Sequence, residues 1–109
     1  MSYIPDQGDI IWLEFNPQSG HEQKGRRPAL VISNYFFNMQ TGLSFVCPIT
    51  SVKRKYPLHV GIDSCNGISG YVMVEQVKSV DYQSRNAEYV GKAPEILLNE
   101  VLSILQACL

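Results

Sequence analysis

The chain has 109 residues and a formal net charge of −1, with 45% hydrophobic and 17% charged residues. This balance excludes a disordered chain, no apolar run approaches the roughly 20 residues of a membrane span, and the length suits one domain over residues 1–109. Residues 1–8 lack the basic and apolar runs of a signal peptide, and Cys47, Cys65 and Cys108 lack disulfide-framework or zinc-site spacing, which fits a reducing cytoplasm.

Short β-forming runs separated by turn residues fill most of the chain. We expect strands at 9–15, 28–33, 43–50, 58–62, 70–76, 78–81 and 86–90. A helical turn is expected at 34–39, and Pro94, Glu95 and leucines at helical spacing predict a helix over 94–108. Five to seven short strands and one C-terminal helix predict a mainly β fold, a small and strongly curved antiparallel barrel.

Positive charge is concentrated in the first half of the chain. Residues 1–55 carry six Lys or Arg against four Asp or Glu, whereas residues 56–109 carry three against six. The cations form two clusters in predicted loops, Lys24 with Arg26 and Arg27, and Lys53 with Arg54 and Lys55. Two solvated loops are the simpler interpretation, but a local positive patch on a near-neutral protein can also hold a polyanion.

The predicted loop over residues 16–28 reads NPQSGHEQKGRRP and has no apolar residue other than its flanking prolines. An acid, a histidine and three cations fall within its last part, a set that suits chemistry at a phosphodiester. With the preceding strand GDIIWLEF it resembles the opening of the MazF/PemK/Kid toxins of bacterial toxin–antitoxin modules. The resemblance continues in VCPIT at 46–50, in EQVKS at 75–79 and in a terminal helix that begins with Pro-Glu, so it covers essentially the whole chain.

The resemblance implies an SH3-like/PemK-type barrel and a toxin that is a sequence-specific endoribonuclease. Such a toxin cleaves single-stranded mRNA without the ribosome, a metal or any other cofactor, and thereby inhibits translation and growth. The resemblance also implies a cytoplasmic homodimer with no membrane contact, and a cognate antitoxin with a disordered acidic tail whose complex binds its own operator DNA. Two alternatives remain open: a CcdB-like gyrase poison on the same fold, acting through the end of its C-terminal helix, and a catalytically silent RNA binder.

The resemblance assigns catalysis to Arg27 and Thr50. A guanidinium can clamp a phosphate through paired donors, and a hydroxyl at a strand end can donate to a non-bridging oxygen. Glu22 and His21 are the candidates for accepting a proton or reading a base edge, and the Kid-like branch carries this histidine whereas other members do not. The second histidine, His59, lies in an alternating strand and is expected to be structural.

Other residues are expected to bind RNA. Gln76 and Lys78 fall on alternate positions of one predicted strand and would share a face, and Glu75 lengthens the family's usual aspartate, which is expected to alter base preference. Phe15 is expected either to stack on a base or to lie in the core, and Trp12 to lie in the core or a dimer interface. The remaining candidates are Lys24, Arg26, Ser51, Lys53, Arg54 and Lys55. The loops at 51–57 and 63–70 are expected to set the cleavage sequence.

Overall fold

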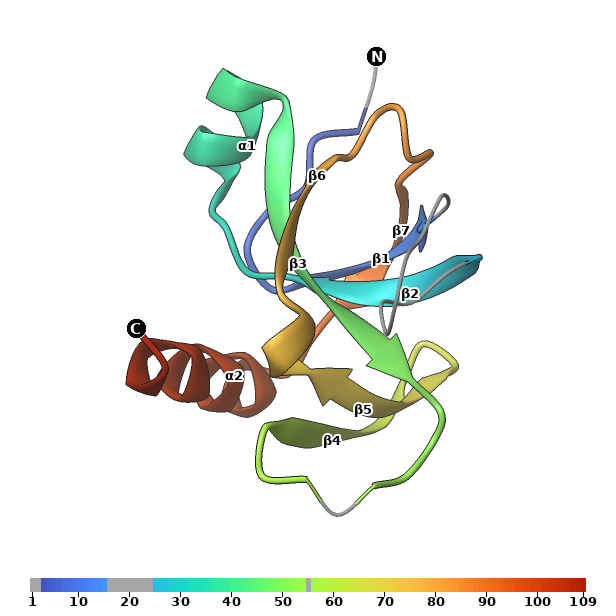
Figure 1. The fold of residues 1–109 in the computed structure, drawn as a ribbon. Coiled ribbons are helices and arrows are strands. Elements are labelled where there is room, and N and C mark those ends of the chain that lie inside the picture. The colour runs from blue at the N-terminus through green and yellow to red at the C-terminus, as the bar shows by residue number, and fades with distance from the viewer. Residues whose placement is uncertain (1–2, 16–24, 55) are drawn as a thin grey trace.

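The computed structural model describes residues 3–15, 25–54 and 56–109. In chain order its elements are β1 (Asp9–Glu14), β2 (Arg26–Val31), α1 (Tyr35–Thr41), β3 (Leu43–Thr50), β4 (His59–Cys65), β5 (Ile68–Met73), the 3₁₀ helix η1 (Val74–Gln76), β6 (Lys78–Asp81), β7 (Glu88–Lys92) and α2 (Glu95–Ala107) (Figure 1). The mainly β fold with a C-terminal helix is therefore confirmed.

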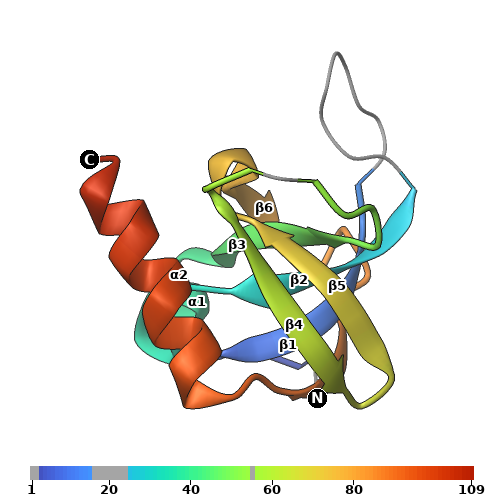
Figure 2. The same cartoon turned by 90° about the horizontal axis from the view of Figure 1, so that it is seen from below.

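The strands form one antiparallel sheet in the order β4-β5-β3-β2-β1-β7, with β6 paired to β3 outside this path. On the edge away from β2, the strand β3 pairs with two strands in turn: Leu43 to Val46 pair with β6, whereas Ile49 and Thr50 pair with β5. This division lets the sheet curl into a half-barrel, and α2 lies against β4 and η1 (Figures 1 and 2). The described residues contain no helix both long enough and apolar enough to span a membrane.

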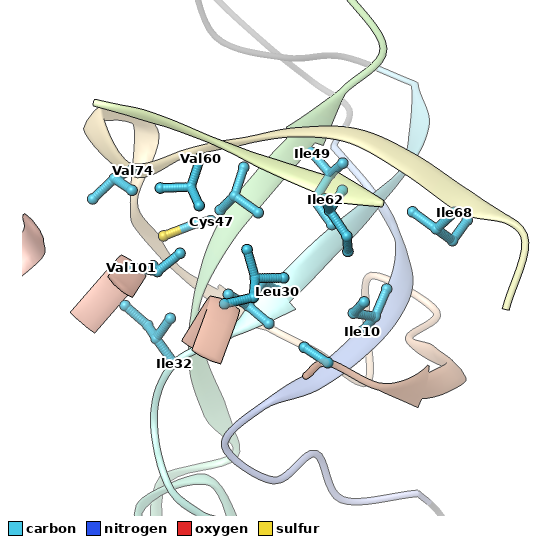
Figure 3. Packing of buried hydrophobic residues seen from close by; sticks show 13 residues of the cluster. Ile10, Leu30, Ile32, Cys47, Ile49, Val60, Ile62, Ile68, Val74 and Val101 are labelled. Atoms are coloured by element: carbon cyan, nitrogen blue, oxygen red, sulfur yellow. The ribbon is translucent and has the colours of Figure 1, made fainter. Parts of the chain in front are cut away.

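Buried apolar side chains form two clusters, one on each face of the curled sheet. Alternation along β1 sends Ile10 to the larger cluster and Ile11 to the smaller one, and β2 divides Leu30 and Ala29 in the same way. In the larger cluster Val101 of α2 packs with side chains from β2, β3 and β4 (Figure 3). Each strand position can therefore be assigned to one face of the sheet.

The helix α1 is anchored by Asn38, a polar residue with no exposed surface. Its Nδ2 donates to the carbonyl oxygens of Pro5 at 2.7 Å and Ser33 at 3.2 Å, and its own carbonyl accepts a bond from the Tyr82 hydroxyl at 2.8 Å. Because all these groups are buried, the network ties α1 to the N-terminal segment and to the end of β6.

Several predicted strands differ from the observed ones by one to three residues at an end, and two of these differences affect the site. The strand expected from residue 28 begins at Arg26, because Arg26 and Arg27 pair with Glu14 and Leu13 of β1, so neither arginine lies in a loop. The strand expected at 70–76 ends at Met73 and is followed by η1. The argument that residues 76 and 78 share a face of one strand therefore fails, since the first lies in η1 and the second begins β6.

Candidate functional site at the strand ends

Arg27 and Thr50 lie at the same end of the neighbouring strands β2 and β3. The β2–β3 pairing ends at Ala29 opposite Pro48, and extending this register by two residues along both strands brings Arg27 level with Thr50. Both residues also line the same cleft. Residues directly opposite each other project from the same face, with their Cβ atoms about 5 Å apart. The register therefore brings together the guanidinium and the hydroxyl that the sequence predicts to be catalytic.

The pairing continues on both sides into a cross-strand row of five residues. Leu13 of β1 pairs with Arg27, Thr50 pairs with Tyr71 of β5, and Tyr71 pairs with Gly61 of β4. Leu13 is fully buried and Gly61 has no side chain, so the polar groups of the row are a guanidinium, an aliphatic hydroxyl and a phenol. The row is a polar stripe crossing the sheet at the level where β3 ends.

Two open clefts of about 310 Å³ each lie beside this level of the sheet. The first is lined by Trp12, Arg26, Arg27, Pro28, Ile49, Thr50, Ser51, Gly67, Ile68 and Ser69. The second is lined by Ser51, Gly61, Ile62, Asp63, Ser69, Gly70 and Tyr71. Because Ser51 and Ser69 line both clefts, an extended ligand can lie across the two.

Thr50 is held in place by an unusually close approach of β5. It is 5% exposed, and its Oγ1 accepts a bond from the Val52 amide at 3.2 Å, which leaves the hydroxyl proton for another acceptor. A Cβ at Gly70 would lie 2.2 Å from the Thr50 carbonyl oxygen and 3.3 Å from Cα of Ser51, and Gly70 has a φ of +135°. Only glycine allows this approach, so Gly70 fixes the position of Thr50.

The hairpin between β4 and β5 forms one wall of the first cleft and is anchored to β7. Its two turn residues, Asn66 and Gly67, have φ values of 48° and 86°, as a type I′ hairpin turn requires. The Asn66 Nδ2 donates to the Val90 carbonyl oxygen at 2.7 Å, and a Cβ at Gly91 would lie 2.5 Å from that nitrogen. The glycine in β7 therefore makes room for the side chain that holds the wall.

Arg26 differs from Arg27 in its surroundings. Its guanidinium lies 3.0 Å from the Glu88 carboxylate and 3.7 Å from the Glu14 carboxylate, and it also donates to the Asn86 carbonyl oxygen at 3.1 Å. Neighbouring residues of a strand point to opposite faces, so the two arginines diverge. Arg26 lines the first cleft, but two carboxylates balance its charge.

Phe15 and Lys78 adjoin each other on the smaller cluster's face. Phe15 is fully buried in that cluster, so the prediction that its ring stacks on a base is wrong and its core alternative holds. The Lys78 Nζ lies 5.4 Å from the centroid of the Phe15 ring. The face of the Phe15 ring thus serves as a platform for the cation of Lys78.

His59 and Glu75 are in hydrogen-bond contact, which the sequence does not indicate. The His59 Nε2 lies 3.0 Å from the Glu75 Oε2, and the two side chains are 4% and 26% exposed. The expected structural position of His59 fits this burial. The two residues stand 16 positions apart on β4 and η1, which explains why local patterns give no signal for their contact.

The other predicted site residues divide into two groups. Exposed residues that follow β3 are Ser51, Lys53 and Arg54. His21, Glu22, Lys24 and Lys55 lie outside the described residues. Within the described part of the chain, no group of three or more His, Cys, Asp or Glu side chains is arranged to hold a metal ion.

Sequence reasoning did not single out Ser69 and Tyr71 as cleft residues. Trp12, expected in the core or a dimer interface, packs against the larger cluster and also lines the first cleft. The indole of Trp12 is half-buried at the first cleft, and its pairing with Pro28 places it there. Ser69 falls in the 63–70 segment, which is one of the two loops expected to set the cleavage sequence. Tyr71 gives no sequence signal, since its place depends on the pairing of β5 with β3.

Comparisons with known proteins all point to one family of toxins. A sequence model of the family described as "PemK-like, MazF-like toxin of type II toxin-antitoxin system" matches residues 6–109. The chain is similar to the endoribonuclease toxin MazF of Escherichia coli K12, with 41% identity over 96 residues that cover 87% of this chain and 86% of that protein. It is 39% identical to the endoribonuclease toxin ChpB of the same strain, over 94% and 91% of the two chains.

Solved structures agree with these sequence matches. The crystal structure of MazF (Form-I) from Deinococcus radiodurans superposes with a TM-score of 0.93 at 45% identity, over 98% of this chain and 97% of that one. The MazE-MazF complex (Form-III) from the same organism gives a TM-score of 0.87 at 42% identity, over 97% and 96%.

Proposed function

The chain belongs to the PemK-like, MazF-like toxins of type II toxin–antitoxin systems, and from that premise we propose that it is a sequence-specific endoribonuclease. Its substrate is single-stranded mRNA, cleaved without the ribosome, and the outcome is inhibition of translation and growth. Relatives named endoribonuclease toxins support the activity. The observation that carries the proposal is the register that sets Arg27 opposite Thr50 beside an open cleft.

The proposed reaction uses the 2′-hydroxyl of the RNA as the nucleophile. Its oxygen bonds to the adjacent phosphorus while the bond to the 5′-oxygen breaks, which gives a 2′,3′-cyclic phosphate and a 5′-hydroxyl. Arg27 contributes paired N–H donors to the non-bridging oxygens, and Thr50 contributes a hydroxyl donor. The 2′-hydroxyl loses a proton and the 5′-oxygen gains one, with Glu22 and His21 as the candidates for this exchange.

The clefts suggest how the RNA lies. The exposed residues Ser51, Lys53 and Arg54 follow directly after Thr50, where cations attract the phosphate backbone. Trp12 offers an indole at the first cleft on which an unpaired base can stack, the role that the buried Phe15 cannot take. We assign the further RNA contacts to Lys24, Arg26, Lys55, Glu75, Gln76 and Lys78.

The proposed partners follow from the family and from the surface. Residues 1–109 act as one toxin domain and form a homodimer, which would cover apolar side chains such as Ile96, 83% exposed on α2. A cognate antitoxin then fills the RNA clefts with an acidic tail, in a complex that binds its operator DNA. The MazE-MazF complexes of the Deinococcus radiodurans proteins support such a partner.

The proposal is tested by incubating the purified protein with a long single-stranded RNA in EDTA and mapping the new ends. We expect cleavage at a short recurring sequence, with 2′,3′-cyclic phosphate and 5′-hydroxyl ends, and no cleavage of the same sequence in a fully paired duplex. Growth inhibition without RNA cleavage would contradict the proposal in favour of a CcdB-like toxin. Cleavage that stops in EDTA and returns with a divalent ion would refute the proposed chemistry.

A further inference from the structure

The contact between His59 and Glu75 is part of a well-fixed corner of the fold, outside both clefts. His59 pairs with Met73, the last residue of β5, and the Val74 amide donates to the Leu58 carbonyl oxygen at 3.1 Å. The backbones of β4 and η1 are therefore tied together on either side of the contact. The side chain of Glu75 is held in a defined orientation rather than left to rotate in solvent.

The surroundings of the imidazole determine which nitrogen donates. The ring packs edge-on against Tyr56, with centroids 5.0 Å apart, and its Nδ1 is buried with no hydrogen-bond partner among the described residues. A proton on Nδ1 would therefore be buried without an acceptor, which is unfavourable. The arrangement favours a proton on Nε2, which donates to Oε2 of Glu75.

Glu75 retains one unengaged oxygen. Its side chain is 26% exposed, and within the described part of the chain its Oε1 accepts no hydrogen bond. The cross-strand row pairs Tyr71 with Gly61, and two residues further along the same strands Met73 pairs with His59. The His59 position thus shares the face of Arg27 and Thr50. A carboxylate repels phosphates, so on an RNA-binding face it can contact favourably only the donors of a base or a sugar.

We propose that Glu75 reads one base of the RNA and that His59 restricts it to a single acceptor oxygen. Adenine and cytosine each present one amino group beside a ring acceptor, which a single oxygen can satisfy. Guanine presents its N1–H and N2–H side by side, a pair that matches both oxygens of an unrestrained carboxylate. Uracil presents its single N3–H between two carbonyl oxygens, and these repel an approaching carboxylate. The pair therefore selects adenine or cytosine at one position; this selection rests on the proposed ribonuclease function and specifies its sequence preference.

The test is to sequence the cleavage sites of the full-length protein and its variants in a randomised single-stranded RNA pool. The wild type should favour adenine or cytosine at one position, and H59L should raise the relative cleavage at guanine there about tenfold, the scale of one bidentate contact. H59Q, whose amide N–H can still donate to Glu75, should keep the wild-type preference. In the Glu75→Ala background H59L should change nothing, because His59 acts only through the carboxylate.

A second variant keeps the inference testable if H59L does not fold. In E75Q the amide oxygen would accept the His59 bond and turn the NH₂ donor toward the base. Every base presents an acceptor to such a donor, so the preference for adenine or cytosine should be lost. An unchanged preference in both H59L and E75Q, or the same shift of H59L without Glu75, would overturn the inference. If the wild type cleaves no RNA, the proposed function and this inference both fall; if it cleaves but the variants match it, only this inference falls.

Discussion

The substitution Gly70→Ala tests whether the close approach of β5 positions the hydroxyl of Thr50. The added Cβ would lie 2.2 Å from the Thr50 carbonyl oxygen, so the end of β3 has to move by about 1 Å to restore a normal contact. A displacement of that size at a reacting group costs about 10²-fold in rate. An alanine at a φ of +135° strains the folded backbone, which should lower the free energy of unfolding by about 1–3 kcal/mol.

The rate is measured as single-turnover cleavage of a short fluorogenic RNA, and stability is measured by urea unfolding. Gly42→Ala is the matched control, because Gly42 also has a positive φ, of 72°, but a Cβ there meets no atom within 4 Å and the residue caps α1 away from the clefts. It should lose stability and keep the cleavage rate. A folded Gly70→Ala protein with the wild-type rate would refute the positioning role.

Other predictions concern the core and the hairpin. Asn38→Ala should lower the free energy of unfolding by about 2–4 kcal/mol in urea titrations, since it leaves buried carbonyl groups unpaired. Burial raises the pKa of the Cys47 thiol to about 12 from an ordinary 9.0, and Glu75 adds to the shift. The unfolded thiol therefore ionises first, and stability should fall by up to about 1.4 kcal/mol per pH unit from pH 9 to 12. In Cys47→Val this contribution should be missing, so stability should fall less steeply, most clearly between pH 9 and 10; above pH 10 a slope remains, because burial also raises the pKa of the Tyr3 and Tyr82 phenols. Asn66→Ala frees the hairpin from Val90 and should raise KM for RNA more than it lowers kcat in steady-state assays; the reverse pattern would argue against an anchored wall.

Local sequence patterns predict those strands and helices whose ends are determined by their own residues. The strand β3 matches its expected range because Gly42 ends the preceding helix and an unbroken β-forming run follows. The helix α2 begins one residue after Pro94, as its composition indicates. The beginning of β2 is different, because Arg26 extends the strand only through its pairing with Glu14, a contact that no local rule contains.

The candidate site, too, depends on contacts between segments far apart in the sequence, which local patterns do not predict. Arg27 and Thr50 are identified from motifs, but their placement opposite each other depends on the register of β2 with β3. The burial of Phe15 depends on its packing in the smaller cluster, whereas its position beside a polar loop left both base stacking and a core position open. The contact of His59 with Glu75 joins two elements through the fold alone.

The joint action of Arg27 and Thr50 on the scissile phosphate is tested most directly by comparing two adjacent arginine variants in single-turnover cleavage in EDTA. Arg27→Ala should lose at least about 10²-fold in rate, since one donor to the transition state contributes about 3–4 kcal/mol. Arg26→Ala should weaken RNA binding, but at saturating enzyme its cleavage rate should stay within about threefold, because its guanidinium is paired with Glu14 and Glu88 and points from the opposite face. An Arg27→Ala protein that cleaves at the wild-type rate, or equal losses in the two variants, would contradict this assignment.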